Sequence, residues 1–212
     1  MTIAIPRLDR STAALSGLTL ADFLVPIRIG ERVDPRLRHI ALVIIGALFV
    51  ALCAQVYIPT KPVPFTGSTF GVLLAGGALG FRRGGLAILL YLAVGLLGVP
   101  VFAEGKAGLA VIQGVTGGYL IGFAVAGAIV GRLAELGWDR RLGGSLAAML
   151  IGSAVIYAIG VPWLKVVTGL TWSEAVAAGL TPFLVWDAAK VAVAASIFPM
   201  AWWLIGRRPD DR

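Results

Sequence analysis

The sequence predicts an all-α integral membrane protein, built as a bundle of six transmembrane helices. Hydrophobic residues make up 58% of the chain and charged residues only 14%, and the mean hydropathy of +0.92 lies outside the range of soluble domains. The apolar stretches are long and continuous rather than alternating with a period of two, which indicates helices and not barrel strands. The 28 glycines suit close helix packing in lipid.

Hydropathy divides the chain into a basic N-terminal extension at residues 1–38, a membrane domain at 39–206 and a short tail at 207–212. The expected spans are residues 39–58, 68–80, 86–99, 109–133, 142–164 and 181–206. The second and third are shorter than the ~20 residues that cross a bilayer. We therefore expect them to extend into their flanking loops or to be tilted and broken.

The extension before the first span is polar and basic, and it lacks the apolar core of a signal peptide. Within it, Leu18 to Ile29 has the pattern of a weak amphipathic helix that lies on the anionic inner leaflet. A disordered leader is the alternative interpretation of the same segment, and the sequence does not favour either.

Basic residues predict the orientation, because the arginines and lysines between the spans fall on opposite sides. The lysines of the loops, Lys61, Lys106 and Lys165, lie on one side. The other side carries every arginine: Arg7, Arg10, Arg28, Arg32, Arg36, Arg38, Arg82, Arg83, Arg132, Arg140, Arg141, Arg207, Arg208 and Arg212. By the positive-inside rule both termini are cytoplasmic, in a multi-pass protein of the inner (plasma) membrane. The net charge of +7 therefore reports topology and not nucleic-acid binding.

The segments expected on the outward side carry unusual chemistry. Residues 59–67 contain three prolines, which fix the backbone and predict a stiff loop. Residues 98–108 combine apolar side chains with a glycine-rich backbone, and residues 113–119 let backbone amides approach a ligand or a helix closely. We expect these segments to converge near the outer ends of the spans.

Asp187 and Lys190 form an intramembrane pair, three residues apart within the apolar run from 181 to 205. A charge at that depth costs roughly 2.5–3.5 kcal/mol by insertion scales, and a spacing of three puts both side chains on one helix face. One interpretation is an ion pair that only helps helices pack. The favoured interpretation is a polar site for a small solute inside the bundle.

Other functional classes lack the residues that they need. With a single cysteine, Cys53, and a single histidine, His39, the chain has neither an internal disulfide nor a Cys/His metal cluster. It has no glycine-rich phosphate-binding loop, so it does not hydrolyse ATP by that route. His39 is expected at the cytoplasmic rim, away from Asp187, which disfavours an intramembrane enzyme. We expect no catalytic residue, no cofactor and no metal.

Several motifs run in a specific order through nearly everything after residue 39. They are Pro62-Val-Pro-Phe-Thr66 with Thr69-Phe-Gly-Val72, Gly95-Leu-Leu-Gly-Val-Pro-Val-Phe-Ala103, Thr116-Gly-Gly-Tyr-Leu-Ile-Gly-Phe123, Tyr157 with Trp163-Leu164, and Pro182-Phe-Leu184 with Asp187 and Lys190. In these motifs the chain resembles the BioY family, the biotin-binding S components of energy-coupling factor (ECF) transporters. It departs from the family pattern at Ser68, Val115 and Trp186, where glutamine, proline and glycine are expected.

The resemblance implies a high-affinity biotin-binding membrane subunit that mediates biotin uptake and is energised by a separate transmembrane coupling subunit with cytoplasmic ATPases. The biotin ureido group offers two N–H donors and one carbonyl acceptor, which Asp187 and Lys190 can meet with charge-assisted hydrogen bonds. Lys106 or Lys61 is expected to meet the carboxylate, with Lys190 as the alternative. The expected walls of the site are Phe65, Thr66, Phe102, Gly117, Gly118, Tyr119, Tyr157 and Trp163.

Ala47-x-x-x-Ala51 offers small residues one turn apart on the first span, and the resemblance implies that this face docks the coupling subunit. Ordinary bundle packing is the alternative, since Gly118-x-x-x-Gly122 has the same pattern. For the whole protein, the alternative function is a self-sufficient carrier of biotin or another small solute that works without ATPases. The expected partners are thus biotin, membrane lipid and the ECF subunits, and no nucleic acid.

Overall fold

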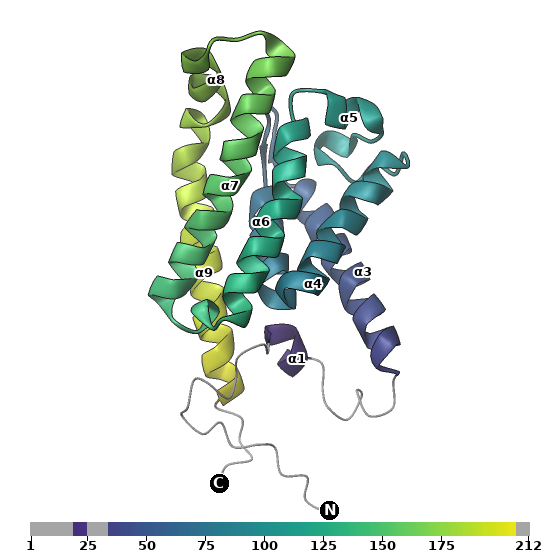
Figure 1. Ribbon diagram of the computed structural model, residues 1–212, viewed down its shortest axis with the longest axis vertical. Coiled ribbons are helices and arrows are strands. Elements are labelled where there is room, and N and C mark those ends of the chain that lie inside the picture. The colour runs from purple at the N-terminus through teal and green to yellow at the C-terminus, as the bar shows by residue number, and fades with distance from the viewer. Residues whose placement is uncertain (1–18, 25–33, 207–212) are drawn as a thin grey trace, which may run out of the picture.

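A computed structural model describes residues 19–24 and 34–206, which form an elongated bundle of helices (Figure 1). The helices are α1 (Leu20–Leu24), α3 (Pro35–Ala54), α4 (Ser68–Leu96), α5 (Leu109–Gln113), α6 (Gly117–Glu135), α7 (Leu142–Thr168), α8 (Trp172–Gly179) and α9 (Leu184–Gly206). Short 3-10 turns lie at Ala103–Gly105, Trp138–Arg140 and Thr181–Phe183. The strands β1 (Tyr57–Ile58) and β2 (Phe65–Thr66) pair antiparallel.

Helix α3 has a defined start and an earlier end than its apolar run suggests. Pro35 occupies the first turn, where a missing N–H costs nothing, and the Asp34 carboxylate accepts a hydrogen bond from the Arg36 amide at 2.8 Å. The helix ends at Ala54 rather than at residue 58. The difference arises because the residues that follow turn away and enter β1, which pairs with β2.

Helix α4 contains both the second and the third expected spans, and it reverses direction between them. Gly80 has φ +83° and ψ −179°, a conformation that glycine adopts at no steric cost. A Cβ atom on Gly84 would lie 2.9 Å from the Gly76 Cα, although eight residues of continuous helix would separate the two by about 12 Å. The segments before and after Gly80 therefore fold back on each other as two arms.

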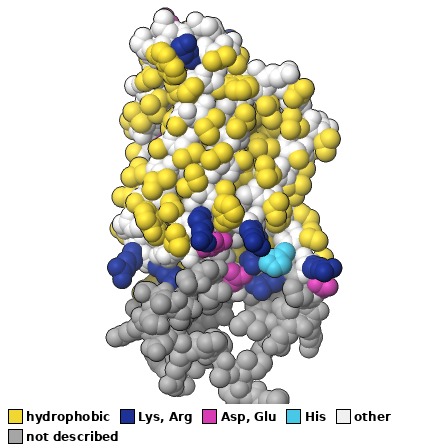
Figure 2. All heavy atoms as spheres, viewed as in Figure 1, with side chains coloured by type: hydrophobic (Ala, Val, Ile, Leu, Met, Phe, Trp, Pro, Cys, Tyr) yellow, Lys and Arg dark blue, Asp and Glu magenta, His cyan; other side chains and the backbone are white. Residues whose placement is uncertain are grey.

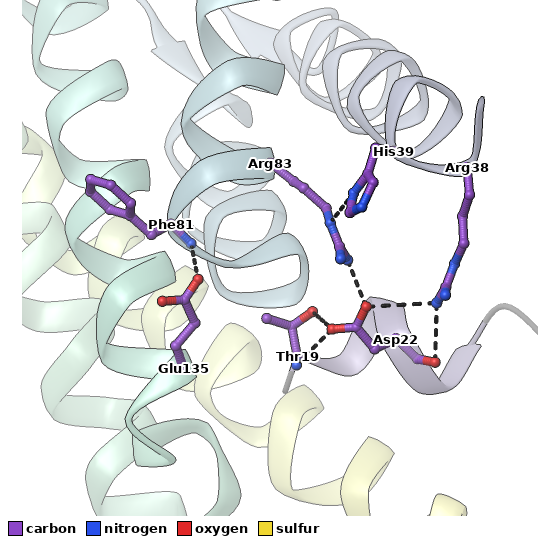
Figure 3. A network of polar contacts seen from close by, with 7 residues as sticks. All are labelled: Thr19, Asp22, Arg38, His39, Phe81, Arg83 and Glu135. Carbon is purple, nitrogen blue, oxygen red and sulfur yellow. Dashed lines mark hydrogen bonds and ion pairs between the residues drawn. The ribbon is translucent and has the colours of Figure 1, made fainter. Parts of the chain in front are cut away.

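The reversal leaves the first amides of the second arm without partners in their own helix. The Glu135 carboxylate at the end of α6 accepts a hydrogen bond from the Phe81 amide at 2.9 Å (Figure 3). Glu135 also forms an ion pair with Arg132 at 3.0 Å. A carboxylate is favoured at this position by the partial positive charge of a helix N-terminus, so α6 stabilises the start of the second arm.

Five helices in the described residues are long and apolar enough to cross a membrane. The expectation of six transmembrane helices is not confirmed as such, because the short second and third spans are the arms of one element. The fourth expected span is also divided, into α5 and α6. The sixth expected span corresponds to α9, and the sequence did not predict the short helix α8 that precedes it.

Helix α1 packs under the reversal of α4, where Leu20 and Ala21 are buried. Asp22 accepts hydrogen bonds from the amide and hydroxyl of Thr19 and from the Arg83 guanidinium at 2.8 Å (Figure 3). Arg83 also donates to the His39 ring at 2.9 Å. Burial alone would raise the pKa of Asp22, but the bonds from Arg83 and Thr19 hold it below its usual value. These contacts join α1 to α3 and α4.

Charged side chains gather at the α1 end of the face in Figure 2, and hydrophobic side chains cover the middle. The described arginines lie at the start of α3, at the reversal of α4 and around the connection of α6 to α7, which are all at this end (Figure 1). The orientation in a membrane stays a prediction. Outside the described residues lie most of segment 18–29 and Arg7, Arg10, Arg28, Arg32, Arg207, Arg208 and Arg212.

Candidate functional site

The structure contains a cavity of about 80 Å³. The elements that supply its lining meet at the end of the bundle opposite α1 (Figure 1). Segments distant in sequence meet there: the β1–β2 loop and β2, both arms of α4, the connection from α4 to α5, and α6, α7 and α9. The lining residues are Val63, Pro64, Thr66, Ser68, Thr69, Tyr91, Phe102, Ala103, Lys106, Val111, Thr116, Tyr119, Leu120, Phe123, Ile156, Tyr157, Phe183, Asp187 and Lys190.

The Asp187–Lys190 pair provides the charges in the wall of the cavity that α9 contributes. The Lys190 ammonium lies 3.0 Å from Asp187 Oδ1, 2.6 Å from the Thr66 carbonyl oxygen and 3.3 Å from Thr69 Oγ1. The other carboxylate oxygen of Asp187 accepts a short hydrogen bond from the Tyr157 hydroxyl. Asp187 is only 6% exposed, so these bonds replace the water that a buried carboxylate gives up.

Aromatic side chains form a continuous wall beside the pair. Tyr119 meets Tyr157 edge to face, with ring centroids 6.2 Å apart, and Tyr157 lies 6.4 Å from Phe183. The Tyr119 hydroxyl donates to the Gly179 carbonyl oxygen at 2.8 Å, which fixes its ring between α6 and α8. Such a wall suits an apolar ring or aliphatic chain of a ligand.

The connection between α4 and α5 contributes Phe102 and Lys106 to the cavity. Gln55, just after α3, donates to the carbonyl oxygens of Val101 at 3.1 Å and Phe102 at 3.2 Å. Lys106 forms an ion pair with Glu104 at 2.8 Å and its side chain is 56% exposed. Lys106 thus places a cation where the cavity meets solvent.

Seven of the residues expected at the site lie at this cavity: Thr66, Phe102, Lys106, Tyr119, Tyr157, Asp187 and Lys190. Their role in ligand binding stays a prediction. Phe65 stacks on Phe183 from outside the lining, with ring centroids 4.5 Å apart. Lys61 is exposed and does not line the cavity.

Gly117, Gly118 and Trp163 also lie outside the lining and form a packing contact between α6 and α7 instead. A Cβ atom on Gly118 would lie 2.2 Å from the Trp163 Cβ, and the Trp163 indole donates to the Gly114 carbonyl oxygen at 2.9 Å. The glycines therefore make room for the tryptophan, and a role of these three residues in ligand binding stays a prediction.

Sequence reasoning did not assign Tyr91, Thr69 or Phe183 to the site, and it treated Ser68 only as a departure. All four line the cavity. Thr69 and Phe183 fall inside the quoted motifs, which was an available signal. Tyr91 lies in a long apolar run, where nothing in the local pattern says which way its hydroxyl faces. Trp186, the third departure from the family pattern, is 55% exposed and lies outside the lining.

The docking face expected at Ala47 and Ala51 is not a free surface in this structure. Ala47 is 7% exposed and belongs to the hydrophobic core, and Ala51 is half-buried against the same core. Small residues at this spacing let α3 approach the rest of its own bundle, which is the packing alternative. The structure thus shows a packing role for Ala47, and docking by this face stays a prediction.

A sequence model of the BioY family matches residues 26–207, which is most of the chain. The chain belongs to the BioY family. The cavity is therefore a feature of a BioY protein, and the motifs that suggested the resemblance supply its charged pair and several of its walls.

Relatives in the BioY family match over most of their own length. Biotin transporter BioY2 of Lactococcus lactis subsp. cremoris (strain MG1363) is 35% identical over 171 residues, covering 79% of this chain and 91% of that protein. Biotin transporter BioY of Thermotoga maritima is 38% identical, with 74% and 87% covered. Biotin transporter BioY of Rhodobacter capsulatus is 37% identical, with 74% and 88% covered.

A solved structure has the same fold. The crystal structure of the S-component for biotin from an ECF-type ABC transporter superposes with a TM-score of 0.72, covering 79% of this chain and 92% of that chain at 23% identity. The likeness shows that the bundle described here is the fold of that S-component.

Proposed function

We propose that this chain is a membrane subunit, an S component, that binds biotin in the cavity described above and mediates its uptake. The observation that carries the proposal is the buried Asp187–Lys190 pair at a cavity walled by aromatic rings, in a chain of the BioY family. The relatives are named as biotin transporters, which supports the same ligand here and a role in transport rather than catalysis.

The cavity offers groups that match the parts of biotin. Asp187 accepts hydrogen bonds from the ureido N–H groups, because a carboxylate oxygen has lone pairs beyond those used by Lys190 and Tyr157. The thiophane ring and aliphatic tail lie against Tyr119, Tyr157 and Phe183. Lys106, which is exposed at the mouth, meets the carboxylate by exchanging its partner Glu104 for the ligand.

The proposal extends to the assembly. A transmembrane coupling subunit and cytoplasmic ATPases energise uptake. The protein lies in the inner (plasma) membrane with both termini cytoplasmic. Residues 39–206 form the binding domain of six membrane segments, between a basic N-terminal extension and a short C-terminal tail. The likeness to the S-component of an ECF-type transporter supports this arrangement.

The test is a mass-spectrometric search for biotin in the purified protein, followed by titration of the stripped protein with biotin and with pantothenate as a control vitamin. Saturable binding of biotin alone is expected. Absence of biotin binding by correctly folded protein would sink the proposal. Uptake measured in cells with and without a coupling module then separates the S component from a self-sufficient carrier, because only the carrier works alone.

A further inference from the structure

Tyr91 lines the cavity from the second arm of α4, and its hydroxyl oxygen is buried. Its side chain is 2% exposed, and its ring meets Phe102 edge to face at 5.5 Å and 85°. Phe102 in turn fills the space above Gly95, where a Cβ atom would lie 2.2 Å from the ring. Packing therefore fixes the Tyr91 ring, and with it the position of the hydroxyl oxygen.

The Tyr91 hydroxyl has no hydrogen-bond partner within residues 19–24 and 34–206. Ser68, in the same cavity wall, is the polar side chain that interacts with the Tyr91 hydroxyl, but the two hydroxyls do not meet the geometry of a hydrogen bond. The other two cavity tyrosines are paired, Tyr119 with a carbonyl oxygen and Tyr157 with Asp187. Because most buried polar groups in proteins are paired, the exception at Tyr91 needs a reason.

Lys190, another donor in the wall of the cavity, is already fully used in this structure. An ammonium group has three N–H donors. In this structure Lys190 contacts three oxygen acceptors, which belong to Thr66, Thr69 and Asp187. A ligand acceptor could reach Lys190 only by displacing one of these oxygens, whereas the buried and fixed Tyr91 hydroxyl has no partner to displace among the described residues.

We propose that the Tyr91 hydroxyl donates a hydrogen bond to the carbonyl oxygen of the ligand's neutral cyclic head group. The inference rests on the proposed function and assigns the ureido oxygen of biotin to Tyr91, while Asp187 takes the N–H groups. A neutral carbonyl suits this position better than a carboxylate does. A buried anion without a cation of its own costs far more than a neutral acceptor that is hydrogen-bonded.

The test uses Tyr91→Phe, which removes only the hydroxyl, with Tyr57→Phe as the control because Tyr57 is 42% exposed and outside the cavity lining. Biotin affinity should fall about 3- to 10-fold, as expected for one neutral hydrogen bond. The thermal midpoint of the unliganded protein should stay equal or rise, because an unpaired buried hydroxyl is removed. The control variant should match the wild type in both.

An infrared measurement separates ligand contact from packing. Biotin labelled with ¹³C at the ureido carbonyl should show a stretching band in Tyr91→Phe at higher frequency than in the wild type, because a donated hydrogen bond lowers that frequency. Unchanged affinity, or weaker binding with an unshifted band, would overturn the assignment of Tyr91. Failure of the wild type to bind biotin would instead count against the proposed function itself.

Discussion

Removing the charges of Asp187 and Lys190 together is the most informative perturbation of the cavity. At their separation of 3.0 Å, two unit charges attract by about 5.5 kcal/mol at an effective dielectric constant of about 20. Desolvation offsets much of this attraction, and breaking a buried pair costs about 3–5 kcal/mol, since one charge is left alone. Each single variant should therefore be destabilised, and each should also bind biotin more weakly.

The structure predicts that the two single variants are not equally destabilised. Lys190→Met leaves the Asp187 carboxylate, 6% exposed, with Tyr157 as its remaining partner, and should cost about 3–5 kcal/mol. Asp187→Asn leaves Lys190 with the oxygens of Thr66 and Thr69, and the lysine side chain is 24% exposed. This variant should cost only about 1–2 kcal/mol. Unfolding followed with a thiol-reactive dye at the single cysteine measures both.

The double variant, Asp187→Asn with Lys190→Met, decides between a structural pair and a binding site. Apolar or neutral replacement of a buried pair is often tolerated, so the double variant should recover most of the stability that the singles lose. If Asp187, held in place by Lys190, binds the ureido N–H groups, the recovered protein still binds biotin about 30- to 5000-fold more weakly, the equivalent of about 2–5 kcal/mol. Near-normal affinity in this variant would refute the assigned site.

Three further predictions address topology, the contacts of α1 and helix packing. Lys165→Cys in a Cys53→Ala background should react with an impermeant thiol reagent in intact cells, and labelling only after permeabilisation would reverse the proposed orientation. Because the pKa of Asp22 is lowered from 3.8 by folding, its carboxylate stabilises the protein above about that pH, and this stability is lost as the pH falls through the lower folded value. Asp22→Asn should cost about 1–2 kcal/mol at pH 7 after allowance for screening. The unfolding midpoint of this variant should depend less on pH than that of the wild type between about pH 5 and 3, which is the window of the titration. Gly131→Ala would bring a methyl group to 2.5 Å from the backbone of α4 and should cost about 1–3 kcal/mol, while Gly143→Ala, with nothing within 4 Å, should be neutral in the same denaturation assay.

Hydropathy and residue spacing predict much of the bundle, because each depends on local sequence alone. The separation of residues 68–80 from 86–99 anticipated the break in α4, and the spacing of Asp187 and Lys190 anticipated their contact on one helix face. Hydropathy could not reveal that the break is a reversal at one residue. That geometry depends on Gly80 adopting a positive φ and on Glu135 reaching it from another helix.

The composition of the cavity wall was harder to predict, because side chains of one type serve both packing and binding. Trp163 and Tyr157 lie on the same helix, yet the first fills the space beside Gly118 and the second faces Asp187. The residues around Tyr91 in the sequence do not indicate that its hydroxyl is buried beside the cavity. Ala47 shows the converse case, since a motif of small residues predicts close packing without saying whether the partner is another chain or the same one.

The reversal at Gly80 also determines how the cavity can change its width. Both arms of α4 reach the cavity, one with Ser68 and Thr69 and the other with Tyr91, and a single residue joins them about 18 Å away along the helix. Since no loop separates the arms, neither can slide along the other. A change in the angle at Gly80 would instead alter the spacing of Ser68 and Tyr91, and with it the width of the cavity, without touching either residue.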